Sequence, residues 1–277
     1  MTLALVARGP VLMTGRRPDP AGRLTSRTSP HTPPARSRLR RGRTRPDRSL
    51  EKALLETYDY VGGLDEVGRG ALAGPVSVGL AIVARRTDDD FPEGLADSKQ
   101  LTARVRTGLV DPVRDWLVDH AVAHASPAEI DEHGIIGALR MAGLRALQQV
   151  ADRGHAPGVI ILDGVADWLT AAQPDLLTAL EGAHCPGASP EPDAVPPTPP
   201  VRMEVKADAK CAVVAAASVL AKVERDCLMA DLDDPGYGWA SNKGYASPAH
   251  IQGLTALGAS DQHRRSWHLP GLEQRHG

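Results

Sequence analysis

Several residue types that mark particular protein classes are scarce in this sequence of 277 residues. Its three cysteines, Cys185, Cys211 and Cys227, have no CxxC spacing, which argues against a disulfide scaffold and structural zinc and favours a reducing, cytoplasmic setting. No apolar run approaches the ~18 residues of a membrane span, so we expect no transmembrane helix. The opening apolar stretch is interrupted by Arg8 and has no convincing small-residue cleavage site, so we expect no signal peptide.

Charge is distributed unevenly along the chain. The first 50 residues hold twelve arginines, no lysine and two acids, whereas the remaining chain carries 20 basic and 32 acidic residues. Residues 1–48 are rich in Pro, Arg, Ser and Thr and have almost no apolar periodicity, so we expect them to form a disordered tail. Two interpretations stay open: an electrostatic arm for nucleic acid, or a solvated segment without function, such as upstream sequence read from a misassigned start codon.

The residues after the tail alternate between strand and helix patterns. Period-two alternation and short β-branched runs predict strands, apolar positions at helical spacing predict long helices, and Ser247 followed by Pro248 predicts the start of one more helix. Strands interleaved with helices predict an α/β domain with a mixed sheet. The proline-rich stretch at residues 185–200 is expected to be an inserted surface loop. The expected strands are 75–83, 158–164 and 201–207, and the expected long helices are 103–120, 137–153 and 209–231.

Four carboxylates follow apolar strands. Asp65 and Glu66 come after VGGL, Asp163 closes VIIL, and Asp208 follows MEVKA at the start of the last long helix. Side chains at strand ends face the functional crevice of an open α/β sheet. Two carboxylates ~4 Å apart repel by roughly 4 kcal/mol at an effective dielectric of about 20, so raised pKa values, paired bases or bound cations must compensate them. Hard oxygen ligands favour Mg²⁺ or Mn²⁺, and a carboxylate site with two such ions is the usual arrangement for phosphodiester hydrolysis.

Several short segments together resemble one nuclease family. DEVGRG is the most specific of them, and its occurrence together with the KAD, AASVLAKV and KGY segments makes coincidence a poor explanation. In their order along the chain, from about residue 62 to residue 267, they are similar to ribonuclease HII. The segments are GLDEVGRGALAGPV (63–76), LADSKQL (95–101), ILDG (161–164), KADAK followed by AAASVLAKVERD (206–226), NKGYASPAH (242–250) and DQHRRSW (261–267).

The resemblance implies a ribonuclease H-like fold over residues 49–277, with a mixed central sheet flanked by helices and a small helical extension at about 230–277. It also implies an endoribonuclease that hydrolyses the RNA strand of RNA/DNA hybrids and incises 5′ of ribonucleotides embedded in duplex DNA. Such an enzyme would use two metal ions and leave 3′-hydroxyl and 5′-phosphate ends. By position in the motifs, the metal-binding and catalytic residues would be Asp65, Glu66, Asp163 and Asp208.

Further residues are candidates for substrate binding. The resemblance implies that the backbone of Gly68, Arg69 and Gly70 approaches the ribose 2′-hydroxyl and that Tyr245 stacks on the adjacent sugar. The chain has six lysines against 26 arginines, yet five of the six lie inside the motif segments, which indicates either phosphate contacts or ion pairs with neighbouring acids. We expect substrate contacts from Lys99 and Lys243, and a phosphate clamp, or alternatively a solvated loop, at Arg264 and Arg265.

Some positions depart from the family pattern. Gln100, Gly134 and Trp267 stand where a lysine, an asparagine and a phenylalanine are usual, which affects the expected substrate affinity more than catalysis. Glu66 raises a geometric problem, because adjacent strand residues face opposite sides of a sheet. We expect a β-bulge after Asp65 to bring both carboxylates to the same side.

Two other functions stay open on the sequence alone. One is a different nuclease of the same fold, such as a Holliday-junction resolvase or an exonuclease, and the other is a catalytically silent module that binds hybrids. Cleavage of a duplex with one ribonucleotide, compared with an all-DNA duplex, distinguishes the favoured enzyme from the other nucleases because only the favoured enzyme needs the 2′-hydroxyl. Binding without cleavage in Mg²⁺ would indicate the silent module. No pattern indicates a membrane partner or requires more than a monomer.

Overall fold

The structure is a computed structural model that describes residues 45–170 and 198–272. The strands of this part are β1 (Tyr60–Val67), β2 (Val76–Ala84), β3 (Asp119–Ala125), β4 (Val159–Asp163) and β5 (Val201–Glu204). They form a five-stranded mixed sheet in the order β3-β2-β1-β4-β5. β1 pairs antiparallel with β2, and β2 with β3, whereas β4 runs parallel to β1, and β5 to β4.

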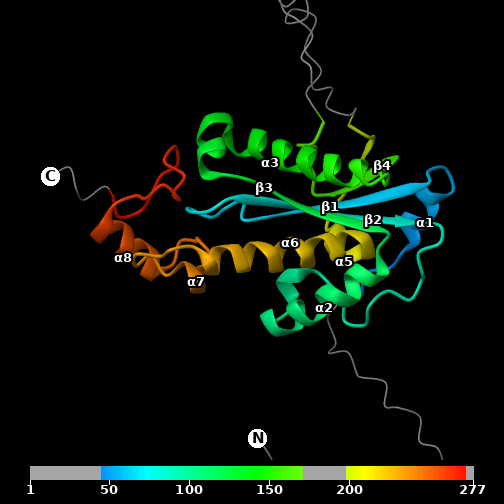
Figure 1. The fold of residues 1–277 in the computed structure, drawn as a ribbon, viewed down its shortest axis with the longest axis horizontal. Coiled ribbons are helices and arrows are strands. Elements are labelled where there is room, and N and C mark those ends of the chain that lie inside the picture. The colour runs from blue at the N-terminus through cyan, green and yellow to red at the C-terminus, as the bar shows by residue number, and fades with distance from the viewer. Residues whose placement is uncertain (1–44, 171–197, 273–277) are drawn as a thin grey trace, which may run out of the picture. The chain divides into compact units, whose positions relative to one another are not determined.

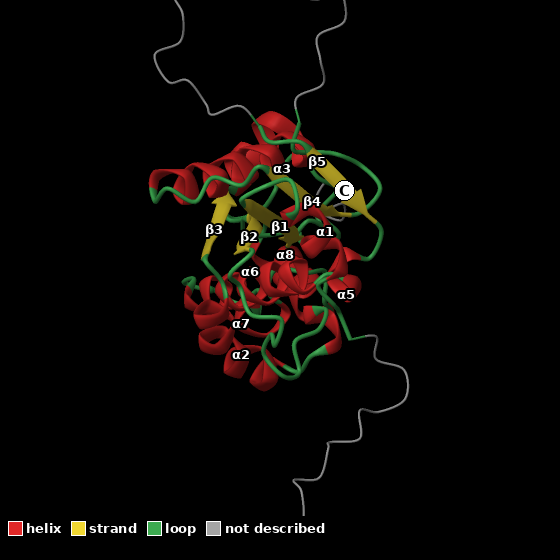
Figure 2. Ribbon diagram, turned by 90° about the vertical axis from the view of Figure 1, so that its right-hand side faces the viewer, coloured by secondary structure: helices red, strands yellow, loops and turns green. Residues whose placement is uncertain are grey.

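Helices cover both faces of this sheet (Figure 1, Figure 2). α3 (Pro127–Asp152) packs on one face against the alternate residues that include Leu64 and Leu162. α6 (Ala212–Asp231) packs on the other face, against those that include Val61 and Ile161. The remaining helices of the described residues are α1 (Ser49–Leu55), η1 (Ser98–Gln100), α2 (Ala103–Trp116), α5 (Ala207–Lys210), α7 (Trp239–Asn242) and α8 (Pro248–Leu257).

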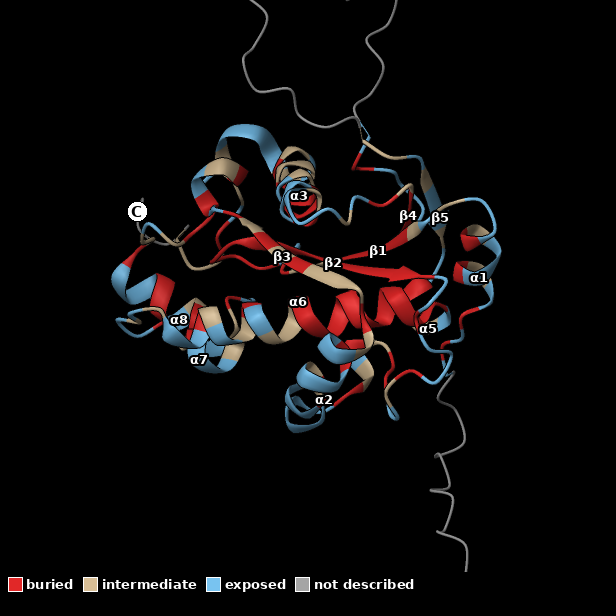
Figure 3. Ribbon diagram, turned by 45° about the vertical axis from the view of Figure 1, so that its right-hand side comes forward, coloured by how far each residue is buried: buried red, intermediate tan, exposed pale blue. Residues whose placement is uncertain are grey.

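The first half of α6 lies very close to the two central strands. A Cβ atom built on Gly79 of β2 would lie 2.4 Å from the carbonyl oxygen of Ala217, so only glycine allows this approach. The helix is alanine-rich and buried where it faces the sheet (Figure 3). This close packing brings α6 and the short α5 before it against the ends of β1 and β4.

The predicted α/β fold with a mixed sheet is confirmed, and β2, β4 and β5 correspond to the three expected strands. The expected helix at 103–120 is wrong at its end, because Leu117 leaves the helix in an extended conformation (φ −75°, ψ 156°) and β3 begins at Asp119. The alternating segment DHAVAHA was therefore missed; its inward side chains are alanines, which give a weak apolar signal.

Two expected helices also differ from the structure. α3 begins at Pro127, ten residues earlier than expected, because Ser126 and Glu129 form a capping box; Gly134 (φ 68°, ψ 168°) then interrupts the helical dihedrals. The expected helix at 209–231 is divided into α5 and α6 by extended backbone at Cys211 (φ −107°, ψ 123°).

The C-terminal helices α7 and α8 form the expected small extension. Ser247 caps α8 and Pro248 occupies its first turn, as predicted. This extension packs through Tyr237 and Trp239 against Leu72 of the loop that follows β1. The loop after β1 is therefore held between the sheet and the C-terminal extension.

The structure describes only the ends of the expected low-complexity segments. Residues 1–44 of the expected tail and most of the expected loop at 185–200 lie outside the described residues. Asp47 and Arg48, at the end of that tail, contact the folded domain: the Asp47 N–H donates to the carbonyl of Lys210 (2.8 Å), and Arg48 pairs with Asp89 (3.1 Å). Among the helices of the described part, none has the length and apolarity to cross a bilayer.

Candidate active site

Asp65 and Asp163 occupy matching positions at the ends of two neighbouring parallel strands. The pairing of β1 with β4 ends at Leu64 and Leu162, whose side chains pack on the α3 side of the sheet. Because strand residues alternate between faces, the next residue on each strand faces α6. Asp65 is only 4% exposed, and Asp163 accepts a 2.7 Å hydrogen bond from the N–H of Ala207. The sheet register therefore puts both carboxylates on one face.

Asp208 approaches this face from the first turn of α5. It is 5% exposed, and with Asp163, Asp97 and Lys99 it lines a cavity of about 330 Å³. The Lys99 ammonium lies 3.5 Å from Oδ2 of Asp208. Asp163 and Asp208 thus share one cavity with Lys99, a residue expected to bind substrate, and Asp65 is close enough to Asp163 and Lys99 for their charges to interact.

The electrostatics of these groups reflect burial and mutual repulsion. Burial raises the pKa of Asp65 to about 7, and the carboxylates of Glu66 and Asp163 act in the same direction, against the Ser218 hydroxyl. Burial is also the main cause of the raised pKa of Asp208, followed by repulsion from Asp163.

The same carboxylates also affect the pKa of Lys99. Burial alone would lower the pKa of its ammonium, but the combined attraction of Asp65, Asp208 and other carboxylates raises it. Lys99 is therefore held in its charged form beside the acids, and its side chain remains 69% exposed.

Glu66 does not share the face of the other three acids. The pairing of β1 with β2 continues without interruption to Val67 opposite Ser77, so the expected bulge is wrong. Every residue of this end of β1 has a partner on β2, and no extra residue is available to turn the chain. Glu66 instead pairs with Arg69 (3.3 Å), while its N–H donates to Oδ1 of Asp65 (2.9 Å).

The carboxylates near this cavity suit a divalent ion by their chemistry. Within residues 45–170 and 198–272, no three Asp, Glu, His or Cys side chains are already arranged as a metal cage. The chemistry of the donors nevertheless fits hard ions, because Asp65, Asp163 and Asp208 offer carboxylate oxygens and the cavity lining includes no histidine or cysteine.

The expected substrate-binding residues lie in different environments. Gly68 is buried, whereas Arg69 and Gly70 are exposed at the tip of the loop after β1. The Tyr245 side chain is 39% exposed and available for stacking. The Lys243 ammonium donates to the main-chain carbonyl of Asp226 (2.9 Å), which ties its side chain to α6.

The two arginines of the expected phosphate clamp do not act together. Arg265 is exposed and pairs with Asp261 (2.8 Å). Arg264 is 0% exposed, and its guanidinium donates to the carbonyls of Gly68 (2.6 Å) and Arg69 (2.8 Å). The expectation that Arg264 touches phosphate is therefore wrong, because the surrounding loops cover it completely.

Sequence reasoning missed three side chains at or near this site. Asp97 lies inside the LADSKQL segment and lines the cavity, and Ser218 acts on Asp65 from α6. Arg225 is fully buried on α6. The sequence did contain a sign that Arg225 is buried. Arg225 follows Ala221 by four residues and therefore lies on the apolar face of that helix.

Known proteins share the sequence pattern and the fold of this chain. The sequence profile of the ribonuclease HII family matches residues 62–269. Ribonuclease HII of Streptomyces avermitilis is 41% identical over 234 residues (83% of this chain, 87% of the relative), and that of Paracoccus denitrificans 40% over 228 residues (80% and 91%). The crystal structure of ribonuclease H2 from Pyrococcus horikoshii superposes with a TM-score of 0.56 at 27% identity, covering 79% of this chain and all of that one.

Members of this family use divalent metal ions, and the oxygen donors at the ends of β1 and β4 suit them. The substrate of the family is a nucleic acid hybrid. The chain belongs to the ribonuclease HII family and is an endoribonuclease that cleaves RNA in RNA/DNA hybrids and at ribonucleotides embedded in DNA.

Proposed function

We propose that Asp65, Asp163 and Asp208 hold Mg²⁺ or Mn²⁺ and form the catalytic centre for this cleavage, and that Glu66 adds its negative charge to the centre from the neighbouring face of β1. The observation that carries the proposal is the register of β1 and β4, which sets Asp65 beside Asp163 on the face that Asp208 approaches. Bound divalent ions would supply an activated water and neutralise charge on the leaving 3′-oxygen. The break would lie 5′ of the ribonucleotide and leave 3′-hydroxyl and 5′-phosphate ends.

The protein groups contribute position and charge. Asp65 is rigidly placed, because it is buried at the end of a strand that pairs on both sides up to Leu64. Asp163 is fixed by its hydrogen bond from Ala207. Lys99 carries a largely exposed ammonium among the residues that line the cavity. When the substrate binds, the Lys99 ammonium can exchange its contact with Asp208 for a contact with a phosphate oxygen of the nucleic acid. The positive charge of Lys99 would then stabilise the bound phosphate.

Recognition of the ribonucleotide would come from two surfaces next to these acids. Arg69 and Gly70, which follow the buried Gly68, expose their main chain at the surface, and a glycine-rich loop lets a backbone approach a ribose closely. Tyr245 offers an exposed ring for stacking on the neighbouring sugar. Lys243 and the exposed Arg265 lie on the same C-terminal segment and are proposed to contact phosphates.

The test is cleavage of a duplex that contains one ribonucleotide, with and without Mg²⁺, by the parent and by Asp65→Asn. We expect the substitution to abolish cleavage while leaving duplex binding largely intact, because it removes one carboxylate charge and preserves the side-chain volume. Asp115→Asn, on the exposed side of α2, is the matched control and should cleave like the parent. Cleavage by Asp65→Asn at near the parental rate would refute the assignment.

A further inference from the structure

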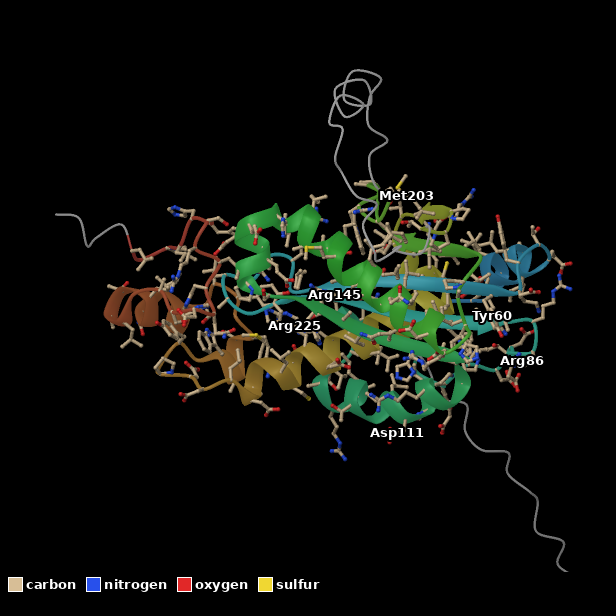
Figure 4. The ribbon with its side chains drawn as sticks, turned by 45° about the horizontal axis from the view of Figure 1, so that its top comes forward. Tyr60, Arg86, Asp111, Arg145, Met203 and Arg225 are labelled. Carbon is tan, nitrogen blue, oxygen red and sulfur yellow. The ribbon has the colours of Figure 1, made fainter. Side chains whose placement is uncertain are left out.

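Two arginines are buried side by side beneath the loops that the proposed function assigns to substrate reading. Arg225 of α6 and Arg264 are both 0% exposed (Figure 4 labels Arg225). Neither forms an ion pair with any acid in the described part of the chain. Burial lowers the pKa of Arg264 to about 9, and the neighbouring Arg225 cation adds to the shift. The protein therefore encloses two adjacent positive charges without a paired anion.

Their hydrogen-bond partners are almost all main-chain carbonyls of two loops. Arg264 donates to Gly68 (2.6 Å), Arg69 (2.8 Å) and Gly74 (3.2 Å), all in the loop after β1. Its own main-chain N–H donates to the carbonyl of Leu72 (3.0 Å), which fixes its backbone against the same loop.

Arg225 connects that loop to the turn before Tyr245. Its guanidinium donates to the carbonyls of Pro75 (2.9 Å) and Ala73 (3.3 Å) on one side and of Lys243 (3.0 Å) on the other. Its charged carbon lies 5.7 Å from the centroid of the Tyr245 ring. One buried side chain thus sets the position of both substrate-reading elements relative to α6.

The carbonyl bonds of Arg264 determine where the N–H groups of the loop point. In a trans peptide the C=O and the following N–H point in opposite directions. Because Arg264 holds the carbonyls of Gly68 and Arg69 inward, the N–H groups of Arg69 and Gly70 point outward. Both residues are exposed, and among the described residues these two N–H groups donate to no protein acceptor. Successive outward N–H groups form a concavity for anions or hydroxyl oxygens.

The absence of a side chain at Gly68 is needed for this contact between the loop and the arginines. Gly68 has φ +82°, and a Cβ atom there would lie 2.1 Å from Nε of Arg225. Any side chain would push the loop away from the arginines and tilt its peptide planes. The loop therefore rests directly on the guanidinium groups.

The positive charge of Arg225 and Arg264 indicates a role beyond holding the loop in place. Enclosing a cation without an anion costs several kcal/mol, whereas neutral donors could satisfy the same carbonyls without that cost. A buried charge polarises the peptide groups that it holds and adds positive potential at their outer ends. The favourable partner for that potential is the anionic backbone of the substrate.

We propose that Arg264 and Arg225 are positioning residues for ribonucleotide recognition: they orient the N–H groups of Arg69 and Gly70, and the turn that carries Tyr245, toward the 2′-hydroxyl and adjacent phosphate. This inference deepens the proposed function and rests on it. Arg264 acts through the loop and does not touch the nucleic acid.

The test separates recognition of the 2′-hydroxyl from general binding of DNA. We would measure KM and kcat for a duplex with one ribonucleotide, and the inhibition constant of the same duplex without it, in one Mg²⁺ buffer. For Arg264→Gln and Arg225→Gln we expect the KM to rise about tenfold, the loss of roughly one hydrogen bond to a polarised donor, while the inhibition constant of the all-DNA duplex stays within about twofold. Equal changes in both constants, or no change in either, would overturn the proposal.

Controls keep the test decisive. Arg114→Gln, on the exposed side of α2, should match the parent in both constants. Thermal unfolding establishes that each variant is folded. If Arg264→Gln does not fold, Arg264→Lys keeps the buried charge but loses the forked geometry, and it should show the same selective rise in KM. Asp65→Asn in the same assay tests the proposed function separately from this inference. If Asp65→Asn still cleaves the duplex, the proposed function is wrong. If Asp65→Asn is inactive but the arginine variants discriminate between the two duplexes as the parent does, only this inference is wrong.

Discussion

Glu51 offers a sharp prediction about the stability of this fold, because it is a carboxyl group enclosed in the core. It belongs to α1 and is 0% exposed. Its Oε1 accepts a 2.9 Å hydrogen bond from the N–H of Val213 at the start of α6, and within the described residues Oε2 has no hydrogen-bond partner. Burial raises the pKa of Glu51 from 4.5 to about 7, although the Val213 N–H opposes the shift.

The direction of the pH effect follows from these two values. In the unfolded chain Glu51 loses its proton near pH 4.5, whereas in the folded protein it keeps the proton until about pH 7. Between these values the folded state binds more protons than the unfolded state, so the free energy of unfolding falls as the pH rises. At about 1.4 kcal/mol per pKa unit, the ionised carboxylate costs about 3 kcal/mol above pH 7.

Glu51→Gln should remove this penalty. The amide resembles the protonated acid in shape and keeps an oxygen for the N–H of Val213. We expect the variant to be more stable than the parent by about 3 kcal/mol at pH 8 and equally stable near pH 4.5. Urea unfolding followed by circular dichroism at both pH values measures this difference.

The exposed Glu56, at the end of α1, supplies the control. Glu56→Gln should show no difference from the parent that depends on pH. If Glu51→Gln is no more stable than the parent at pH 8, or if its advantage is the same at both pH values, the argument from the buried carboxyl is wrong.

Two further predictions concern packing and substrate recognition. Gly79→Ala should lower the free energy of unfolding by about 2 kcal/mol, because the new Cβ would meet the carbonyl oxygen of Ala217. Gly108→Ala, on the open face of α2, should instead raise the free energy of unfolding by about 0.5–1 kcal/mol. Equal effects of the two substitutions in urea unfolding would contradict this packing. Tyr245→Ala should raise the KM for a duplex with one ribonucleotide about tenfold or more, because the exposed ring that stacks on the substrate is lost. Tyr245→Phe keeps the ring and should change this KM little. A similar effect of both variants in steady-state cleavage assays would count against stacking.

The buried arginines change how the HRRS segment is understood. Two adjacent arginines in a sequence suggest a pair of surface charges, but here Arg265 faces solvent and Arg264 faces the interior. The pairing of residues 262–264 with the loop after β1 produces this difference, since Gly74 and Leu72 hydrogen-bond to Gln262 and Arg264. A charge-based prediction cannot see which side of a segment another loop will cover.

Much of the site could be predicted because local patterns carry the information. Strand periodicity located β2, β4 and β5, and the position of Asp65 and Asp163 after the apolar segments VGGL and VIIL marked both carboxylates as side chains that face a crevice. The specific DEVGRG segment and its companions predicted the family, and the family predicted the activity. These inferences need only short-range spacing and the rule that strand ends meet at one edge of a sheet.

The sequence by itself determined the α/β class, the order of the motifs and the identity of the candidate acids, because each depends on residues close together in the chain. The tertiary structure alone decided that Glu66 faces away from Asp65, since an unbroken ladder with β2 leaves no room for a bulge. It also decided that Arg264 and Arg225 are enclosed, since loops distant in sequence supply the carbonyls that replace water around them. Burial and register are properties of what packs against a residue, and no local pattern contains them.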